Sequence, residues 1–344
     1  MSILEQNWTI VMFPKVQIDT AVSYFLLKNF GESKFPGIGQ AGLEFWTELP
    51  DGKNTDDLEK EGFILIDLGG GRFDHHGLGE ANKKYSSSHL IAKYLEVAGR
   101  KDLRRLLEFA RRDDLEGKGT ISHDPIDRAF GLSALLTNLN KTFSDDPKKV
   151  MNLVLPMIVG HYIEENRRYE LLPAEYQKLH QDGKVKIFSA KHFGNDMKVI
   201  YFESDNNSLA GHLRSSMVGA DLVIQRLETG HVNFVTKQSR QIRLHKLARL
   251  VKLLEAEKNN ITLEVDLAEL EKPGRTNGLD HWFYDARANT LQNGGISPQK
   301  IPPSLLSYEE LEQIVKKGLD ISSDKPINFG KSKFSRGRGV VILE

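Results

Sequence analysis

Residues 64–76 read ILIDLGGGRFDHH, and this stretch decides how the first half of the chain is interpreted. Its first residues are continuously apolar, which is typical of a buried strand. Asp67 ends that strand, three glycines follow it, and Asp74, His75 and His76 close the stretch. A carboxylate suits the mouth of a sheet better than a core, and glycines let the backbone turn sharply and approach a bound anion closely. The stretch therefore predicts a strand that leads into a functional loop.

The elements around this stretch predict an α/β fold. Residues 8–13 and 63–66 are expected to form buried strands. Helices are expected at 19–30, where Asp19 would be the N-cap, at 86–97 and at 103–112. This alternation predicts a parallel sheet, and such sheets bind ligands at the ends of their strands and in the loops that follow.

The pattern starts again beyond a long helix expected at 150–169, and the 344 residues exceed the usual size of one core. Strands are expected at 185–188, 197–202, 221–226 and 232–236, and helices at 209–217, 242–254 and 309–319. The Gly- and Asn-rich residues 271–295 are expected to be a loop. We predict a metal-binding catalytic domain at 1–150, a helical connector at 151–182, a smaller α/β substrate-binding domain at 183–325 and a basic tail at 326–344.

The composition limits the chemistry that the chain can perform. It contains 47 basic and 47 acidic residues and no cysteine. Disulfides, thiolate metal sites and a cysteine nucleophile are therefore excluded, and a metal must be held by His, Asp, Glu or water. Net charge favours neither nucleic acid nor membrane, although a local basic patch can still bind a nucleic acid. The N-terminus lacks a signal-peptide pattern and the apolar runs are short, so we predict a cytoplasmic protein without a membrane partner.

Acidic and histidine side chains recur where the predicted strands end. Asp19, Asp67, His75 and either Asp113 or Asp114 would supply the ligands of a divalent ion. Such an ion polarises a phosphoryl oxygen and lowers the pKa of a bound water. Neighbouring side chains of an extended segment point to opposite sides, so His75 and its neighbour are not expected to bind one ion together. One of the two would bind the metal and the other would face the substrate.

Structural interpretations of the same residues remain open at this point. Adjacent histidines are common on surface turns, and Asp67 could cap a helix. Asp113 and Asp114 could be a solvated helix end, although acids at a helix C-terminus oppose the macrodipole. The combination of strand, aspartate, glycine turn, histidine pair and later acidic pair favours a functional site.

The 64–76 stretch, together with YSSSHLIAKYL at 85–95, resembles the DHH phosphoesterase superfamily. Within it, the chain is most similar to the melanocyte-proliferating-gene-type branch, which is related to RecJ-type nucleases. The resemblance implies that Asp19, Asp67 and His75 bind metal, that Asp113 or Asp114 is the last carboxylate ligand, and that His76 contacts the phosphate.

The chain departs from this pattern in its first motif. The branch carries two histidines before the aspartate, whereas this chain has Met12 and Gln17 at the matching positions. Neither residue is a good ligand for a hard cation. We therefore predict one ion per active site, with Mn²⁺ preferred and Mg²⁺ or Zn²⁺ as alternatives. Lys15 would supply positive charge where a second ion is missing, and His76, Asp74 and Lys15 are the residues expected to act in catalysis.

The second domain is expected to hold the substrate. The resemblance implies that Asn293, Gly294 and Gly295 form its glycine-rich turn, and it gives a weak indication for Arg240. Asn277 and His281 lie in a polar segment that could hold a nucleobase or a terminal phosphate, with a structured loop as the equal alternative.

These expectations combine into one functional prediction. The chain is predicted to hydrolyse phosphodiester bonds in short oligonucleotides or nucleotides, as an exonuclease does. The sequence leaves a homo-oligomer open. The alternatives are a degenerate DHH module that binds a nucleotide or protein partner without catalysis, and a hydrolase of small-molecule phosphoanhydrides.

Overall fold

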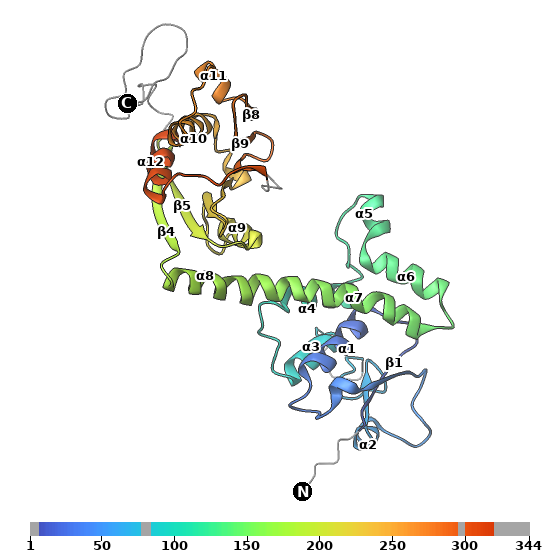
Figure 1. Cartoon of the computed structure of the whole chain (residues 1–344). Coiled ribbons are helices and arrows are strands. Elements are labelled where there is room, and N and C mark those ends of the chain that lie inside the picture. The colour runs from blue at the N-terminus through green and yellow to red at the C-terminus, as the bar shows by residue number, and fades with distance from the viewer. Residues whose placement is uncertain (1–6, 77–83, 295–299, 320–344) are drawn as a thin grey trace. The chain divides into compact units, whose positions relative to one another are not determined.

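The computed structural model describes residues 7–76, 84–294 and 300–319, and the chain forms two compact units, 1–171 and 172–344 (Figure 1). The boundary between them falls inside the predicted connector 151–182, and the predicted tail 326–344 lies outside the described residues. The chain is α/β, with a parallel three-stranded sheet and a larger mixed sheet. Within the described part of the chain, no helix is long and apolar enough to span a bilayer.

The described residues of unit 1 form three short strands and seven α-helices. The strands are β1 (Thr9–Met12), β2 (Gly42–Phe45) and β3 (Phe63–Ile66). The helices are α1 (Ile18–Phe30), α2 (Thr55–Lys60), α3 (Ser87–Tyr94), α4 (Arg104–Glu116), α5 (Pro125–Phe130), α6 (Leu132–Thr142) and α7 (Pro147–Asn166). A 3-10 turn, η1 (Ile38–Gln40), and a π-helical turn, η2 (Arg167–Leu171), complete it.

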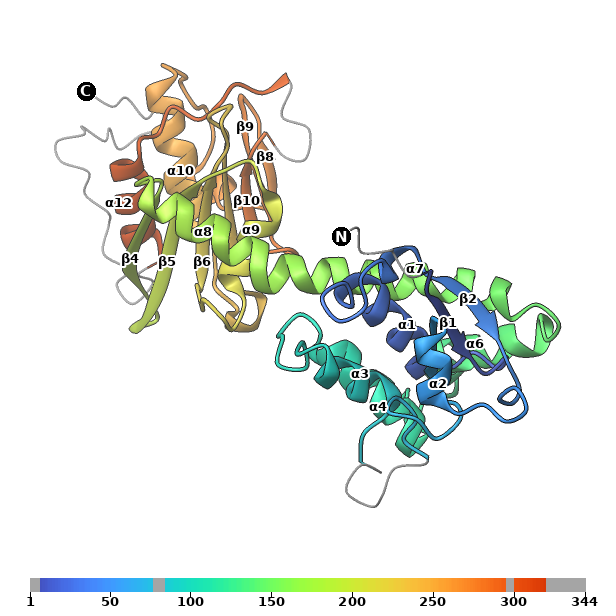
Figure 2. The same ribbon diagram turned by 90° about the horizontal axis from the view of Figure 1, so that it is seen from below.

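The sheet of unit 1 has the order β2-β1-β3, and both pairings are parallel. Met12 lies opposite Ile66, so the loops that follow β1 and β3 leave from the same edge. Ile10 and Ile64 belong to the large core made with helices α1, α3, α4 and α7, and Val11 packs on the opposite face with the residues of α2 (Figure 2). The predicted parallel sheet is therefore confirmed, and its carboxyl edge brings Asp67 close to the start of α1.

Unit 2 is built around one seven-stranded sheet. Its strands are β4 (Val185–His192), β5 (Asn195–Glu203), β6 (Leu222–Arg226), β7 (Val232–Thr236), β8 (Gly274–Thr276), β9 (Leu279–Asp285) and β10 (Thr290–Asn293). Its helices are α8 (Leu172–Gln181), α9 (Asn207–Arg214), α10 (His245–Lys258), α11 (Leu267–Leu270) and α12 (Tyr308–Leu319), with a 3-10 turn at η3 (Gln238–Arg240).

The order of this sheet is β4-β5-β6-β7-β10-β9-β8, and only the β5–β6 pair is parallel. Residues alternate along β5 between its two faces. Val199 and Tyr201 pack with the residues of α10 and α12, whereas Ile200 and Phe202 pack with those of α8 and α9. Helices therefore cover both faces, which explains why residues 199–202 of this strand are continuously apolar and buried.

The expectation of a loop at 271–295 is wrong, because strands β8, β9 and β10 occupy most of it. Leu279, Trp282 and Tyr284 are buried along β9 and pack against helices. The turn-forming residues that suggested a loop lie instead at the hairpin tips, where Gly278 and Asn289 adopt positive φ angles of 80° and 52°. Turn-forming residues are frequent over the whole stretch, so its composition resembles that of a loop although short strands lie between the turns.

The expectation that Asp19 caps its helix is also wrong. Helix α1 begins at Ile18, Gln17 is the N-cap, and the hydroxyl of Thr20 accepts a hydrogen bond from the Gln17 N–H. Asp19 is a helical residue of the first turn and is fully buried. Its carboxylate is therefore free for a task other than capping.

Candidate metal centre

Four segments of unit 1 bring acidic and histidine side chains together at the carboxyl edge of the small sheet. Ligand atoms of Asp19, His75 and Asp114 all lie within 4.8 Å of one another, and so do those of Asp67, His75 and His76. Nδ1 of His75 is 3.4 Å from Oδ1 of Asp67 and 3.6 Å from Oδ2 of Asp114. We call these five residues the acid–histidine cluster.

Asp67 is held in an unusual backbone conformation. Its φ angle is +53°, which a non-glycine residue adopts only when its surroundings enforce it. Its N–H donates to the carbonyl of Phe73, and Oδ1 accepts the hydroxyl of Ser87 at 3.0 Å. These two bonds direct the carboxylate toward the two histidines, and the strained turn is of the kind that recurs at functional sites.

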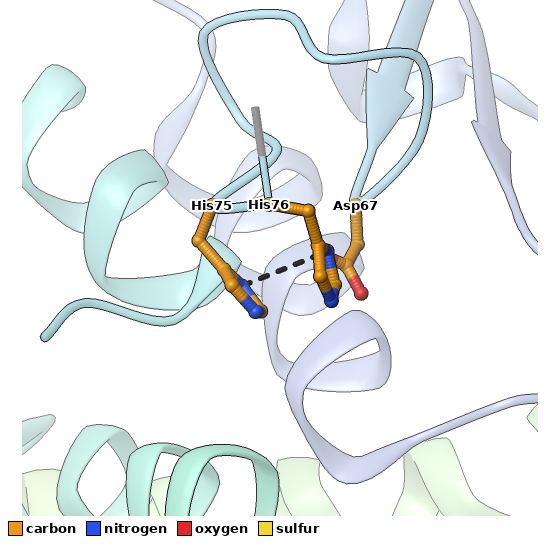
Figure 3. Close-up of side chains that lie close together, drawn as sticks. All are labelled: Asp67, His75 and His76. Carbon is orange, nitrogen blue, oxygen red and sulfur yellow. Dashed lines mark ion pairs between the residues drawn. The ribbon is translucent and has the colours of Figure 1, made fainter. Parts of the chain in front are cut away.

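His75 and His76 lie on the same side of the chain, so the expectation that they point apart is wrong. Their rings stack with centroids 4.0 Å apart and an interplanar angle of 28° (Figure 3). Nδ1 of His76 lies 3.3 Å from Oδ1 of Asp67. The chain is bent rather than extended at these residues, so the alternation of a strand does not apply to them.

Asp74 organises the loop rather than facing the cluster directly. Its carboxylate accepts hydrogen bonds from the backbone N–H groups of Gly70 and His76, and it lies 3.1 Å from Nδ1 of His76. Asp74 thereby positions the His76 ring. The N–H of Gly70, expected to approach an anion, is used within the loop itself.

The glycines of this loop approach protein atoms closely. A Cβ at Gly69 would lie 2.9 Å from a methyl carbon of Leu49, and one at Gly71 would lie 2.8 Å from Cβ of Thr55. Gly69 and Gly70 also have positive φ angles of 80° and 70°. The glycines are therefore required by packing and by turn geometry.

Asp114, and not Asp113, reaches the cluster. Both follow the apolar part of α4, but they face different sides of the helix. Asp113 lies beside Ser133 and belongs to neither ligand group, whereas Oδ2 of Asp114 is buried without a hydrogen-bond partner among the described residues. The sequence left the choice between the two open because adjacent helical positions are 100° apart, and only packing shows which one points inward.

The carboxylates of the cluster are unfavourably placed as anions. Burial raises the pKa of Asp19, and hydrogen bonds from Ser86 and Ser88 only partly oppose it. Burial, and then the charges of Asp19 and Asp67, raise the pKa of Asp114 to about 7. Burial lowers the pKa of His76, but the carboxylates of Asp67 and Asp74 outweigh it and the net shift is upward.

These groups fit a divalent cation. Oδ2 of Asp19, Nδ1 of His75 and Oδ2 of Asp114 are buried, lie together and have no hydrogen-bond partner among the described residues. A buried carboxylate is costly unless a cation or a donor compensates it. Oxygen and imidazole donors of this kind suit Mn²⁺, Mg²⁺ or Zn²⁺.

Two serines of the run at 86–88, to which the sequence alone assigns no role, hold the cluster in place. The hydroxyl of Ser87 donates to Asp67, and the backbone N–H of Ser88, in the first turn of α3, donates to Oδ1 of Asp19 at 3.1 Å. In the sequence, the sign of this support is the run of three serines at 86–88, which starts a helix after the acidic loop.

The residues of the first motif lie beside the cluster. Met12 is fully buried in β1, whereas Lys15 is exposed. A cavity of about 220 Å³ is lined by Lys15, Gln17, Asp113 and Asp114, among others. The predicted role of Lys15 as a substitute positive charge stays a prediction.

The predicted substrate residues of unit 2 do not form one group. Arg240 pairs with the buried Asp221 through an Nε–Oδ1 distance of 2.7 Å. Asn277 is exposed at the tip between β8 and β9, whereas His281 and Asn293 lie side by side on β9 and β10, where Nδ2 of Asn293 donates to the carbonyl of His281 at 2.9 Å.

Some polar atoms at this hairpin have no hydrogen-bond partner among the described residues. They are both ring nitrogens of His281 and Oδ1 of Asn293, and all three are buried. The N–H of Gly294 donates to the same His281 carbonyl. Gly295 lies outside the described residues.

Comparisons with known proteins add little. No protein-family model matches the chain, and no curated protein matches it. An uncharacterized protein from Helicobacter pylori G27 is 11% identical with a TM-score of 0.24, and the match covers 91% of this chain and 99% of that one. The DHH domain of a member of the s1p family of ribosomal proteins is 12% identical with a TM-score of 0.24, covering 91% and 87%. A TM-score of this size carries no argument for fold or function.

Proposed function

We propose that the acid–histidine cluster binds one divalent metal ion, Mn²⁺ by preference, and that the chain is a DHH-type phosphoesterase acting on short oligonucleotides or nucleotides, with exonuclease-like cleavage. One observation carries the proposal. Asp19, His75 and Asp114 each have a buried ligand atom without a hydrogen-bond partner among the described residues, and ligand atoms of the three side chains lie within 4.8 Å of one another. The resemblance of residues 64–76 to the DHH motif supplies the reaction class. A bound divalent ion would polarise a phosphoryl oxygen and lower the pKa of a water.

In this proposal some residues of the cluster hold the metal ion, and His76 stabilises the charge of the phosphate. Asp19, Asp67, His75 and Asp114 are the ligands, and Ser87 and Ser88 orient two of them. The His76 side chain is 68% exposed, and the neighbouring carboxylates raise its pKa, so its ring is favoured as a cation. With Nδ1 directed at Asp67 and Asp74, Nε2 is the atom available to donate to a phosphate oxygen.

The proposal is tested by incubating the protein with Mn²⁺ and a panel of labelled short oligonucleotides and nucleotides. We expect turnover by the wild type and its loss in His75→Ala, because His75 belongs to both ligand groups. His180→Ala is the matched control, because His180 is an exposed residue of α8. Elemental analysis should find one metal equivalent per chain.

The other possible outcomes of the turnover and metal measurements distinguish the alternative functions. No turnover on any substrate, together with no bound metal, refutes the proposal. Bound metal without turnover favours the non-catalytic module, and turnover of phosphoanhydrides alone favours the small-molecule hydrolase. Two equivalents of metal contradict the one-ion assignment, which rests on Met12 and Gln17.

A further inference from the structure

A second, larger cavity lies in unit 1 and does not include the acid–histidine cluster. Its volume is about 840 Å³, and α4 and α7 supply most of its lining. Apolar side chains make up much of the wall: Ile18, Leu106, Leu107, Phe109, Leu132, Met157 and Ile158. None of the five cluster residues lines it. The cavity is therefore a separate feature that the proposed phosphoesterase activity does not use.

Three arginines line this cavity against a single acidic side chain. The acid is Glu108, and its carboxylate is paired with Arg111 at 3.0 Å. Arg105 is bound at 3.0 Å to Glu165, which is almost fully buried. Among the described residues, Arg104 and Arg112 form no ion pair within 4 Å, so positive charge is in excess at this wall.

Arg112 has a buried hydrogen-bond donor that lacks an acceptor among the described residues. Its Nε is buried and has no hydrogen-bond partner within the described part of the chain. A buried donor without an acceptor destabilises the folded state, and the more so when the donor is charged. A guanidinium pairs best with a carboxylate or phosphate, which accepts two parallel hydrogen bonds.

The start of helix α4 adds to this preference for an anion. Residues 104–107 form its first turn and line the cavity. Leu103 at the N-cap offers no side-chain acceptor to the free backbone N–H groups of that turn. The helix dipole therefore contributes positive potential beside Arg104 and Arg105, at one end of the cavity.

We propose that this cavity binds a small organic anion, a phosphate or carboxylate attached to an apolar body, at a site separate from the acid–histidine cluster. Arg112 holds the anionic group, and the wall around Met157 and Leu132 packs against the apolar body. This pairing of charge and apolar surface distinguishes the ligand from an inorganic ion, which would leave the apolar wall unused.

The binding test uses the full-length, metal-free protein, so that it does not depend on catalysis. Isothermal titration is performed with adenosine 5′-monophosphate, with octanoate and with inorganic phosphate, in the presence of a chelator. We expect at least one organic anion to bind with a Kd below about 1 mM, and inorganic phosphate to bind at least tenfold more weakly, because only the organic ligand buries apolar surface. The two organic probes distinguish an aromatic body from an aliphatic one.

Variants locate the binding. Arg112→Met and Met157→Trp should each weaken it at least tenfold, the first by removing the donor and the second by filling the cavity. Met157 is 51% exposed, so its replacement leaves the core intact. Arg128→Met, an exposed arginine of α5 that does not line the cavity, and Asp114→Asn should change the Kd less than threefold.

Two outcomes overturn the proposal. One is that neither organic anion binds the wild-type protein. The other is that both Arg112→Met and Met157→Trp bind as the wild type does while circular dichroism shows all variants folded. Because no metal and no turnover enter the measurement, either failure leaves the proposed phosphoesterase activity untouched.

Discussion

The acid–histidine cluster of unit 1 and the predicted substrate residues of unit 2 differ in how their charges are compensated. In the cluster, carboxylate oxygens of Asp19 and Asp114 are buried and have no hydrogen-bond partner in the described part of the chain. In unit 2, the charge of Arg240 is compensated by the buried carboxylate of Asp221. A buried charge that lacks a partner indicates a missing ligand, whereas a charge that has one is explained by the fold alone.

The largest expected effect in the acid–histidine cluster is a loss of metal affinity when one of its unpartnered carboxylates is removed. Asp114→Asn should weaken Mn²⁺ binding at least about 1000-fold, because even outer-shell partners of metal ligands cost 10–100-fold. Asp113→Asn is the matched control, since Asp113 belongs to neither ligand group, and it should change the affinity less than threefold. Isothermal titration with Mn²⁺ measures both, and equal losses in the two variants would contradict the assignment of Asp114.

The stability of the metal-free protein should fall as the pH rises. The pKa of Asp114 is raised to about 7 in the folded state, above its ordinary value of 3.8. Between these values the folded state binds more protons than the unfolded state, so the free energy of unfolding decreases as the pH rises from about 4 to 7. The loss should amount to about 2–4 kcal/mol.

Urea unfolding in the presence of a chelator, repeated from pH 5 to pH 8, measures this dependence. Asp114→Asn should flatten it and should make the metal-free protein more stable at pH 8, although it binds metal poorly. If the free energy of unfolding of the wild type instead rises with pH, the charged form of Asp114 is not disfavoured in the folded protein. Added Mn²⁺ should stabilise the wild type most at high pH, because the metal binds the deprotonated ligands.

A smaller effect is expected from the serine behind Asp67. Ser87→Ala should lower Mn²⁺ affinity about 10–100-fold, because its hydroxyl orients the carboxylate of Asp67. Ser133→Ala, which removes a hydroxyl beside Asp113, should leave the affinity nearly unchanged. If both serine variants bind Mn²⁺ with wild-type affinity, Asp67 is not held by this bond in the metal complex.

The smallest effect should come from Arg240. Arg240→Met should lower the free energy of unfolding by about 1 kcal/mol, because it leaves the carboxylate of Asp221 without its ion pair. On any substrate found to be cleaved, KM should change less than twofold, and adding Asp221→Asn should restore the stability. A tenfold rise in KM at unchanged stability would instead establish the substrate role that the sequence suggested.

The sequence by itself determined the α/β class and the strand at 63–66, and it named Asp19, Asp67, His75 and the Asp113–Asp114 pair as candidates for the centre. These follow from local rules: apolar runs make buried strands, and carboxylates and histidines at strand ends are poorly suited to a core. The hairpins at β8–β10 were missed because their turn formers outnumber the short apolar alternation between them.

Only the tertiary structure decided how those residues meet. It placed Asp114 rather than Asp113 at the cluster, stacked His75 on His76, and freed Asp19 by giving the N-cap to Gln17. Each of these outcomes depends on a helix rotation or a loop bend that is set by packing between segments distant in sequence. Local spacing carries no information about such contacts, so the sequence identified candidate residues but not their arrangement.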